Sequence, residues 1–267
     1  MPRNPAVAGK FYPAETLTLK SEIQKYLKSD TPKKKSIGLM APHAGYVFSG
    51  DLAGALFSIS EIPDTVILIG PNHTGLGEAA SIASPQPWKM PWGEVPTNTV
   101  LSELIKTGAP FLKECDQAHR YEHSIEVQLP FLYFINNRFS FVAITILGHN
   151  YEISEKLGKA IARGIHAYEK PVLIVASSDM SHYVPGYRAK EMDQPALSKI
   201  LEIDPRGLFD VVQSNSITMC GVMPTITMLV ASKSMGSTKG ELVGYKNSGD
   251  VNGDSENVVS YAGVRIE

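Results

Sequence analysis

Two cysteines are all that the 267 residues contain, Cys115 and Cys220, and this scarcity excludes a fold held together by a framework of disulfides. Few cysteines are also typical of proteins of the reducing cytosol, which we take as the expected compartment. The start of the chain, Met1 to Pro5, lacks the apolar run of a secretory signal peptide. No stretch approaches the roughly 18 apolar residues of a membrane span. We therefore expect a cytoplasmic protein without a membrane segment.

The chain also lacks an excess of charge of either sign. Its 25 basic and 27 acidic residues give a formal net charge of −2 with histidine neutral. This balance provides no electrostatic attraction toward nucleic acid or toward an anionic membrane surface. With 43% hydrophobic and 19% charged residues, the composition is that of a globular protein and not of a disordered chain. We expect neither a nucleic-acid partner nor a membrane partner.

Several common motifs of catalytic and nucleotide-binding proteins are missing as well. The sequence has no Walker A motif, no complete G-x-G-x-x-G loop and no H-E-x-x-H zinc motif. The serines, aspartate and histidine between Ser177 and His182 suggest a hydrolase triad. The chain lacks the G-x-S-x-G nucleophile elbow of such enzymes, however, so a serine hydrolase is disfavoured.

What the chain does contain is an alternation of short apolar runs, which predict buried strands, with segments of helical periodicity. The expected strands are residues 37–40, 65–70, 79–83, 139–147, 172–176, 241–246 and 258–266, the last two as antiparallel neighbours. The expected helices are residues 15–28, 50–59, 99–107, 122–136, 152–168, 186–202, 205–214 and 221–233. This alternation predicts an α/β fold with a mixed sheet flanked by helices. Because no composition break divides the chain, we expect a single domain over residues 1–267.

Residues 84–98 form an unusual segment, because they hold four prolines and both tryptophans. We expect a long irregular stretch here, since loops of this length in compact domains often have a function. The segment is a candidate interface or a cover of the site, and a plain structural loop is the alternative. Another proline, Pro130, is expected to kink the helix at 122–136.

Three of the expected strands each lead into a histidine. His43, His73 and His182 follow the first, the second and the fifth strand of the chain. In an open α/β sheet the carboxyl ends of the strands share one crevice, and ligands bind there. We therefore expect these imidazoles to form a shared site, for which a metal ion is the simplest ligand. His166 lies on an amphipathic helix and is expected at the surface.

Cys220 is a further candidate, because Gly221 begins an expected helix and a thiol at a helix N-terminus has a lowered pKa. A thiolate is a good ligand for a transition metal, although a buried structural cysteine is the alternative. Asp179 can ligate a metal, orient a histidine or cap the following segment. Cys115 has no such setting and is expected to be inert.

His123 lies between Glu122 and Glu126, and we expect His123 and Glu126 on one face of a helix. One interpretation is an acid–base or supporting histidine at the mouth of the crevice. The other is an ordinary helix N-terminus, where acidic residues complement the helix dipole.

Six runs of the sequence, taken in chain order, resemble the Memo family, called AmmeMemoRadiSam system protein B in prokaryotes. They are Ala6-Val7-Ala8-Gly9-Lys10-Phe11-Tyr12-Pro13, Ala41-Pro42-His43-Ala44-Gly45-Tyr46, Gly70-Pro71-Asn72-His73, Glu122-His123-Ser124-Ile125-Glu126, Ser177-Ser178-Asp179-Met180-Ser181-His182 and Met219-Cys220-Gly221. They span nearly the whole chain, and six motifs in one order make the resemblance specific.

The resemblance implies a fold similar to that of class III extradiol dioxygenases, which are non-haem iron enzymes with their site at the carboxyl edge of the sheet. In those enzymes two histidines and one glutamate hold ferrous iron. Carried onto this sequence, His43 and His73 match the first two ligands, and Cys220 stands at the carboxylate position. A thiolate keeps the negative charge of a carboxylate but is softer. Iron(II) is therefore the first expected cofactor, with copper or zinc as alternatives.

The further histidines of the dioxygenases act as acid–base groups. His123 and His182 match them here, and Asp179 lies in the same motif as His182. These three residues are the catalytic candidates that the resemblance implies. An imidazole has an ordinary pKa near 6.5, which suits it to proton transfer.

Two functions remain open as hypotheses. The first is a metal-dependent, dioxygenase-like oxidoreductase whose metal activates O₂ or polarises a substrate of unknown identity. The second is a non-catalytic module that holds a peptide or a small anion in the same crevice. A small molecule or a peptide is thus the expected ligand, and the prokaryotic family name also implies a radical-SAM pathway partner.

Overall fold

A mixed sheet is the central element of the structure, a computed structural model that describes residues 2–27 and 31–267. Eight strands of the nine-stranded sheet form its main path, in the spatial order β10 (Gly240–Asn247), β11 (Val258–Ile266), β1 (Gly38–Ala41), β8 (Leu173–Ser177), β2 (Thr65–Pro71), β7 (Ser140–Ile146), β3 (Ala80–Ile82) and β6 (Lys113–Glu114). The ninth strand, β9 (His182–Val184), pairs with β11. Strands β1, β8, β2 and β7 are parallel neighbours, whereas β10, β11 and β9 pair antiparallel.

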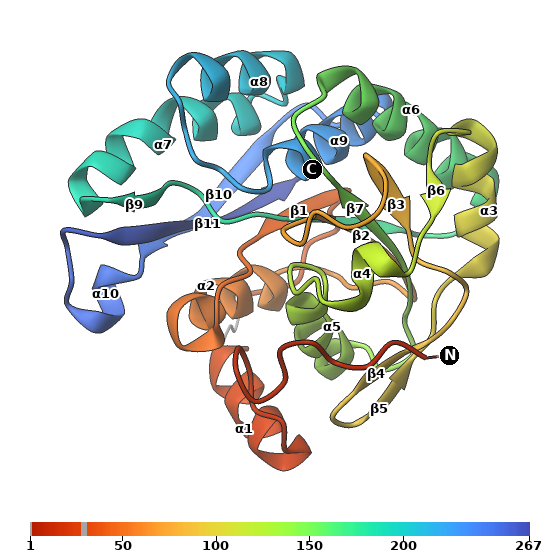
Figure 1. The fold of residues 1–267 in the computed structure, drawn as a ribbon, viewed down its shortest axis with the longest axis horizontal. Helices are drawn as coiled ribbons and strands as arrows, with labels where there is room; N and C mark the ends of the chain where they lie inside the picture. The colour runs from red at the N-terminus through yellow and green to blue at the C-terminus, as the bar shows by residue number, and fades with distance from the viewer. Residues whose placement is uncertain (1, 28–30) are drawn as a thin grey trace.

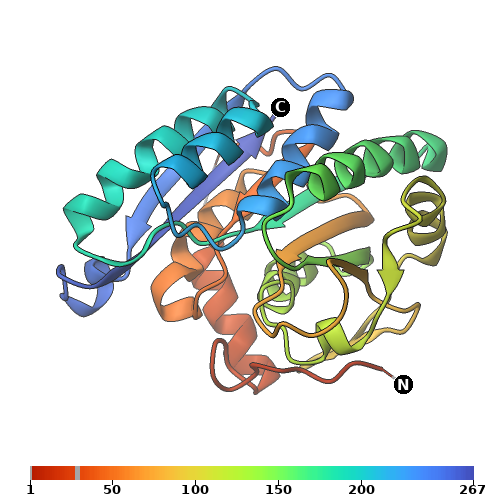
Figure 2. The same cartoon turned by 45° about the horizontal axis from the view of Figure 1, so that its top comes forward.

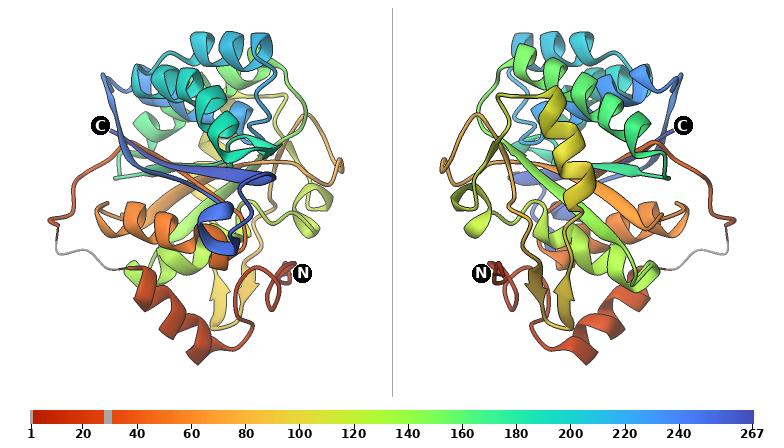
Figure 3. Two further views of the ribbon diagram at one scale, coloured as in Figure 1. Left: turned by 90° about the vertical axis from the view of Figure 1, so that its left-hand side faces the viewer. Right: turned by 90° about the vertical axis from the view of Figure 1, so that its right-hand side faces the viewer.

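Helices cover both faces of this sheet (Figures 1 and 3). One face carries α3 (Thr99–Gly108), α6 (Tyr151–Tyr168), α7 (Gly186–Leu201), α8 (Pro205–Ser214) and α9 (Val222–Ser234). The other face carries α1 (Thr16–Tyr26), α2 (Tyr46–Ser58) and α5 (Leu129–Ile135). Figure 2 shows the first layer of helices lying across the sheet. The predicted single α/β domain with a mixed sheet flanked by helices is confirmed.

Burial on both faces explains why the central strands are continuous apolar runs. Along β2, Ile67 and Ile69 enter the core beneath α6 and α9, and Val66 and Leu68 enter the core on the side of α2 and α5. Successive strand side chains point to opposite faces, so a strand covered on both sides needs apolar residues at every position.

No helix among the described residues is long and apolar enough to cross a bilayer.

The prediction of a helix over residues 122–136 is wrong for the first half of this range. Residues 122–125 lie outside any helix, a short 3-10 turn, η1, spans Glu126–Gln128, and α5 starts only at Leu129. Pro130 stands in the first turn of α5, where the missing N–H would have no intrahelical partner in any case. The proline therefore starts this helix and does not kink it. Consequently His123 and Glu126 do not share a helix face.

The segment 84–98 contains more regular structure than expected. It forms a hairpin of β4 (Trp88–Met90) and β5 (Gly93–Val95), visible at the lower right of Figure 1. Trp88 is buried, and the guanidinium of Arg3 lies 4.1 Å from its ring. Short elements that were not predicted are α4 (Gln117–Arg120), α10 (Gly249–Asn252), β6 and β9. The helix α1 ends at Tyr26, and its expected end at Lys28 lies outside the described residues.

Glu126 ties the amino-terminal arm to the rest of the domain. Its carboxylate lies 2.7 Å from Nη1 of Arg3, and both side chains are buried. It also accepts hydrogen bonds from the backbone N–H groups of Ala6 and Val7 and from the hydroxyl of Tyr12. A buried carboxylate with four donors is fully satisfied, so this one residue fixes the path of the arm.

Replacing Glu126→Ala should lower the free energy of unfolding by about 3–5 kcal/mol, because the buried guanidinium of Arg3 would lose its counter-charge. Chemical denaturation of the purified variant measures this loss. The matched control is Glu103→Ala, which removes a mostly exposed carboxylate paired with Lys106 and should cost less than about 1 kcal/mol. Equal losses in the two variants would contradict the anchoring role of Glu126.

Candidate metal centre

The carboxyl ends of β1, β8 and β2 meet at one edge of the sheet, where they open into a cleft of about 620 Å³. In the register of these strands, Ala41 of β1 pairs with Ser177 of β8, and Ala176 pairs with Ile69 of β2. The chain therefore leaves all three strands at nearly the same level. All six side chains expected in the site line this cleft: His43, His73, His123, Asp179, His182 and Cys220.

Three imidazoles form the centre of the cleft. The ring centroids of His43 and His73 are 5.2 Å apart, and those of His43 and His123 are 5.5 Å apart. The rings of His73 and His123 stack at 4.7 Å. One ligand atom from each of these residues lies within 4.8 Å of the others, so this group of one buried and two more accessible histidines could hold a metal ion.

His43 is the most buried of these histidines. Its Nδ1 lies 2.9 Å from Oγ of Ser177, and its backbone N–H donates to the carboxylate of Asp179 at 2.8 Å. Burial lowers the pKa of His43 well below its ordinary value, and the neighbouring imidazoles of His123 and His73 lower it further. The ring is therefore neutral at physiological pH and keeps a lone pair for a ligand.

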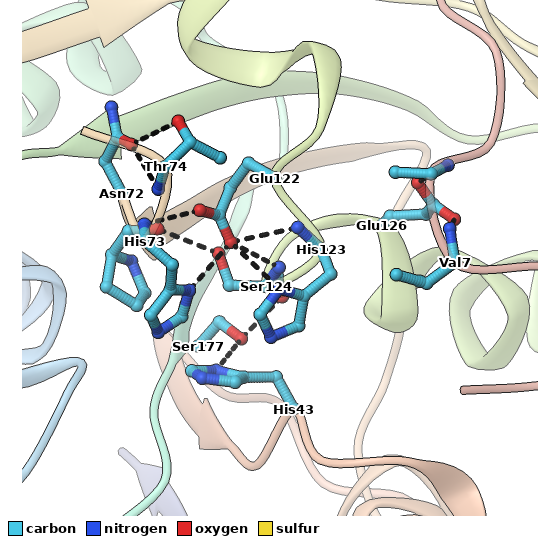
Figure 4. A network of polar contacts seen from close by, with 12 residues as sticks. Val7, His43, Asn72, His73, Thr74, Glu122, His123, Ser124, Glu126 and Ser177 are labelled. Atoms are coloured by element: carbon cyan, nitrogen blue, oxygen red, sulfur yellow. Dashed lines mark hydrogen bonds and ion pairs between the residues drawn. The ribbon is translucent and has the colours of Figure 1, made fainter. Parts of the chain in front are cut away.

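Glu122 holds His73 in place, as Figure 4 shows. One carboxylate oxygen accepts from the backbone N–H of His73 at 2.6 Å, and the other accepts from its Nδ1 at 2.9 Å. Burial alone would lower the pKa of His73, but the hydrogen bond and the charge of Glu122 raise it. Burial likewise raises the pKa of Glu122, but the hydrogen bond with His73 and its charge, with backbone donors, bring it down to about 2.

Gly70 at the end of β2 allows this contact. A Cβ atom at Gly70 would collide with the side chain of Ser124, whose backbone N–H also donates to Glu122. A side chain at this position would push the segment that carries Glu122 away from His73.

The two histidines expected as acid–base groups are His123, one of the three central imidazoles, and His182, which lines the same cleft. Nδ1 of His182 lies 2.9 Å from the backbone carbonyl oxygen of Thr218, and the ring of Phe11 lies 4.8 Å from that of His123. Burial is the main cause that lowers the pKa of both His182 and His123. Both rings are therefore neutral at pH 7 and able to accept a proton.

Cys220 reaches the same centre from the start of α9. Its Sγ lies 3.2 Å from Nε2 of His43 and 3.3 Å from the backbone nitrogen of Asp179. Gly221 makes this approach possible, because a Cβ there would collide with the backbone of residues 177 and 178.

The expected lowering of the Cys220 pKa is wrong. Burial raises the pKa of this thiol well above its ordinary value, and the charge of Asp179 raises it further. The backbone N–H groups near the start of α9 lower it by less. Burial also raises the pKa of Asp179, to about 7, although the N–H of His43 opposes this shift.

The donor set fits a transition metal. Nδ1 of His43, His73 and His182 each has a hydrogen-bond partner, which leaves Nε2 of each ring for a ligand. Imidazoles that bind metals are held in this way by a partner at the second nitrogen. Imidazole nitrogens suit iron, copper or zinc better than calcium or magnesium, which prefer oxygen.

Two residues of this centre were not recognised from the sequence. Glu122 was interpreted as a helix-dipole partner beside His123, although its main contact is His73, 49 residues away in the chain. Ser177 was considered only for a hydrolase triad, yet it contacts His43. The only available signal was their place inside the motifs that also contain His123 and His182.

Replacing Glu122→Gln should lower the pKa of His73, because the amide keeps the shape of the side chain but removes the charge that stabilises the imidazolium. An NMR titration of the metal-free protein measures this shift. The control Glu152→Gln removes an exposed carboxylate on α6 and should leave His73 unchanged. An unchanged pKa of His73 in the Glu122 variant would contradict the coupling.

Comparison with known proteins identifies the family of the chain. The family model for Memo-like protein matches residues 3–265. A MEMO1 family protein of Aquifex aeolicus is 39% identical over 98% of both chains, and one of Methanopyrus kandleri is 36% identical over 99% of this chain and 98% of its own. The fold is similar to the crystal structure of an uncharacterized protein from Escherichia coli K12, with a TM-score of 0.56, 13% identity and coverage of 86% of this chain and 99% of that one. The chain therefore belongs to the Memo family.

Proposed function

We propose that His43, His73 and Cys220 hold one metal ion in the cleft and that the protein has a redox or oxygen-dependent function. The observation that carries this proposal is the approach of Sγ of Cys220 to Nε2 of His43, at 3.2 Å, together with the ring of His73, whose centroid lies 5.2 Å from that of His43. Two ligand atoms of one metal ion lie at about the separation of this sulfur and nitrogen, since metal–nitrogen and metal–sulfur bonds are roughly 2.0–2.3 Å long.

His123 is the competitor of Cys220 for the third position. The three imidazoles alone could hold a metal, because one ligand atom from each lies within 4.8 Å of the others. The resemblance to the extradiol dioxygenases, however, matches His123 to an acid–base histidine and Cys220 to the third ligand. We therefore assign His123 to proton transfer and Cys220 to the metal.

Iron(II) is the proposed metal, with copper or zinc as alternatives for this nitrogen and sulfur donor set. The bound metal would activate O₂ or polarise a substrate. The protein itself provides the groups that handle protons. His123 and His182 are neutral bases in the cleft, and Asp179, with its pKa near 7, can hold or release a proton beside His43.

The cleft gives a substrate access to these groups. The aromatic side chains of Phe11, Phe48 and Tyr261 line it and would pack against an apolar part of a small molecule or a peptide. The substrate would then lie between these aromatic side chains and the histidines.

A second candidate function is a module that holds a peptide or small anion without turnover. The raised pKa of His73 favours it, because an imidazolium in an open cleft attracts an anion. Turnover of a catechol-type substrate by the iron-loaded protein would eliminate this candidate. Saturable peptide binding without any turnover would favour it.

Metal affinities of variants distinguish the proposed ligands from the other histidines and the other cysteine. Under anaerobic conditions the protein should bind iron, copper or zinc, and the double variant His43→Ala, Cys220→Ala should lose at least about 100-fold in affinity because two of three ligands are gone. Elemental analysis and competition with a chelator measure the affinity. His123→Ala should retain the metal.

The matched control is the double variant His166→Ala, Cys115→Ala. His166 is exposed on α6, and Cys115 lies outside the cleft. The control should bind metal as the unaltered protein does. Equal affinities of the control and the His43, Cys220 variant would contradict the proposed site.

A further inference from the structure

A set of buried polar groups stands behind His43, on the side away from the cleft. Its members are the side chains of Ser177 and Gln128 and the backbone carbonyl groups of Pro42 and Ser124. Ser177 and Gln128 are each about 1% exposed, so water does not compete for their hydrogen bonds. We propose that Ser177, oriented by Gln128 and the Ser124 carbonyl, is a positioning residue that fixes the tautomer of His43 with its proton on Nδ1.

The neighbours of the Ser177 hydroxyl determine where its single hydrogen points. Its Oγ lies 2.6 Å from the carbonyl oxygen of Ser124, which can only accept, so the single hydroxyl hydrogen must point there. The remaining lone pairs of Oγ face two nitrogens at 2.9 Å, Nε2 of Gln128 and Nδ1 of His43. With its hydrogen used, Oγ can only accept from His43, and Nδ1 must carry the proton.

Gln128 fixes the direction of this network a second time. Its side-chain nitrogen donates to the carbonyl oxygen of Pro42 at 2.9 Å and to Oγ of Ser177 at 2.9 Å. The reversed amide would place its oxygen against the Pro42 carbonyl oxygen, which has no hydrogen to share. The amide therefore donates, and Ser177 cannot turn its hydrogen toward Gln128 in exchange.

This tautomer determines the state of the other ring nitrogen of His43, Nε2. With the proton on Nδ1, Nε2 of neutral His43 carries a lone pair that faces Sγ of Cys220 at 3.2 Å. This lone pair is what a metal ion requires. The link to metal affinity rests on the proposed function, whereas the tautomer is a property of the metal-free protein.

Removal of the Ser177 hydroxyl would reverse the preference of His43 for the tautomer with its proton on Nδ1. In Ser177→Ala the N–H at Nδ1 would be buried without an acceptor, which is costly. A proton moved to Nε2 would find an acceptor, because Sγ of Cys220 is 3.2 Å away. The variant should therefore favour the tautomer whose Nε2 has no lone pair for a metal.

The ¹⁵N chemical shifts of His43 in the metal-free protein test the tautomer directly. The unaltered protein should show Nδ1 protonated, and Ser177→Ala should show a mixture or a reversed tautomer. Ser58→Ala is the matched control, because its buried hydroxyl donates to a helix carbonyl, that of Gly54, and contacts no histidine. Ser177→Thr keeps the hydroxyl and should keep the tautomer. If Ser177→Ala does not fold, Ser177→Cys keeps the volume with a weak acceptor and should shift the same signals.

Zinc, which has no redox chemistry of its own, is the probe for the effect on metal binding. Ser177→Ala should bind Zn²⁺ about 10–100-fold more weakly, as is typical when the hydrogen-bond partner of a ligating imidazole is removed, and Ser177→Thr should restore the affinity. An unchanged tautomer in Ser177→Ala would overturn the proposal. A changed tautomer in a protein that binds no Zn²⁺ at all would overturn the proposed function and leave the positioning role of Ser177 intact.

Discussion

The parallel register of β1, β8 and β2 is the constraint on which the rest of the site depends. Because these strands run side by side and end at one level, segments more than a hundred residues apart in the chain leave the sheet at the same edge. The small turns that follow carry His43, His73 and Asp179. Cys220 then completes the group from the start of α9, where Gly221 permits close contact with β8. The chemistry of the cleft is thus a consequence of strand order.

Hydrogen bonds to the histidine rings fix their positions at this edge of the sheet. Three imidazoles of the cleft have a hydrogen-bond partner at Nδ1: His43 contacts Ser177, His73 contacts Glu122 and His182 contacts the Thr218 carbonyl. A partner at one nitrogen fixes both the direction of the ring and the nitrogen that remains for a ligand. The structure uses three chemically different partners for one purpose, which argues for a requirement of the site and against a packing accident.

The sequence predicted the strands and the identity of the candidate residues better than it predicted the burial and the contacts of those residues. Apolar runs that end in histidine were sufficient to place His43 and His73, because burial on both faces of a strand leaves a continuous hydrophobic signal. The start of α5 was misjudged, because Pro130 suits the first turn of a helix as well as it suits a kink. Burial of Cys220 and the contact of Ser177 with His43, 134 residues apart, depend on tertiary packing that no local pattern records.

X-ray absorption spectroscopy of the anaerobically loaded protein tests the central claim most directly, because it reports the atoms bound to the metal. The account predicts one sulfur ligand at about 2.3 Å and two imidazole nitrogens at about 2.0–2.1 Å for zinc, with the sulfur signal lost in Cys220→Ala. A shell of nitrogen and oxygen without sulfur in the unaltered protein would contradict it.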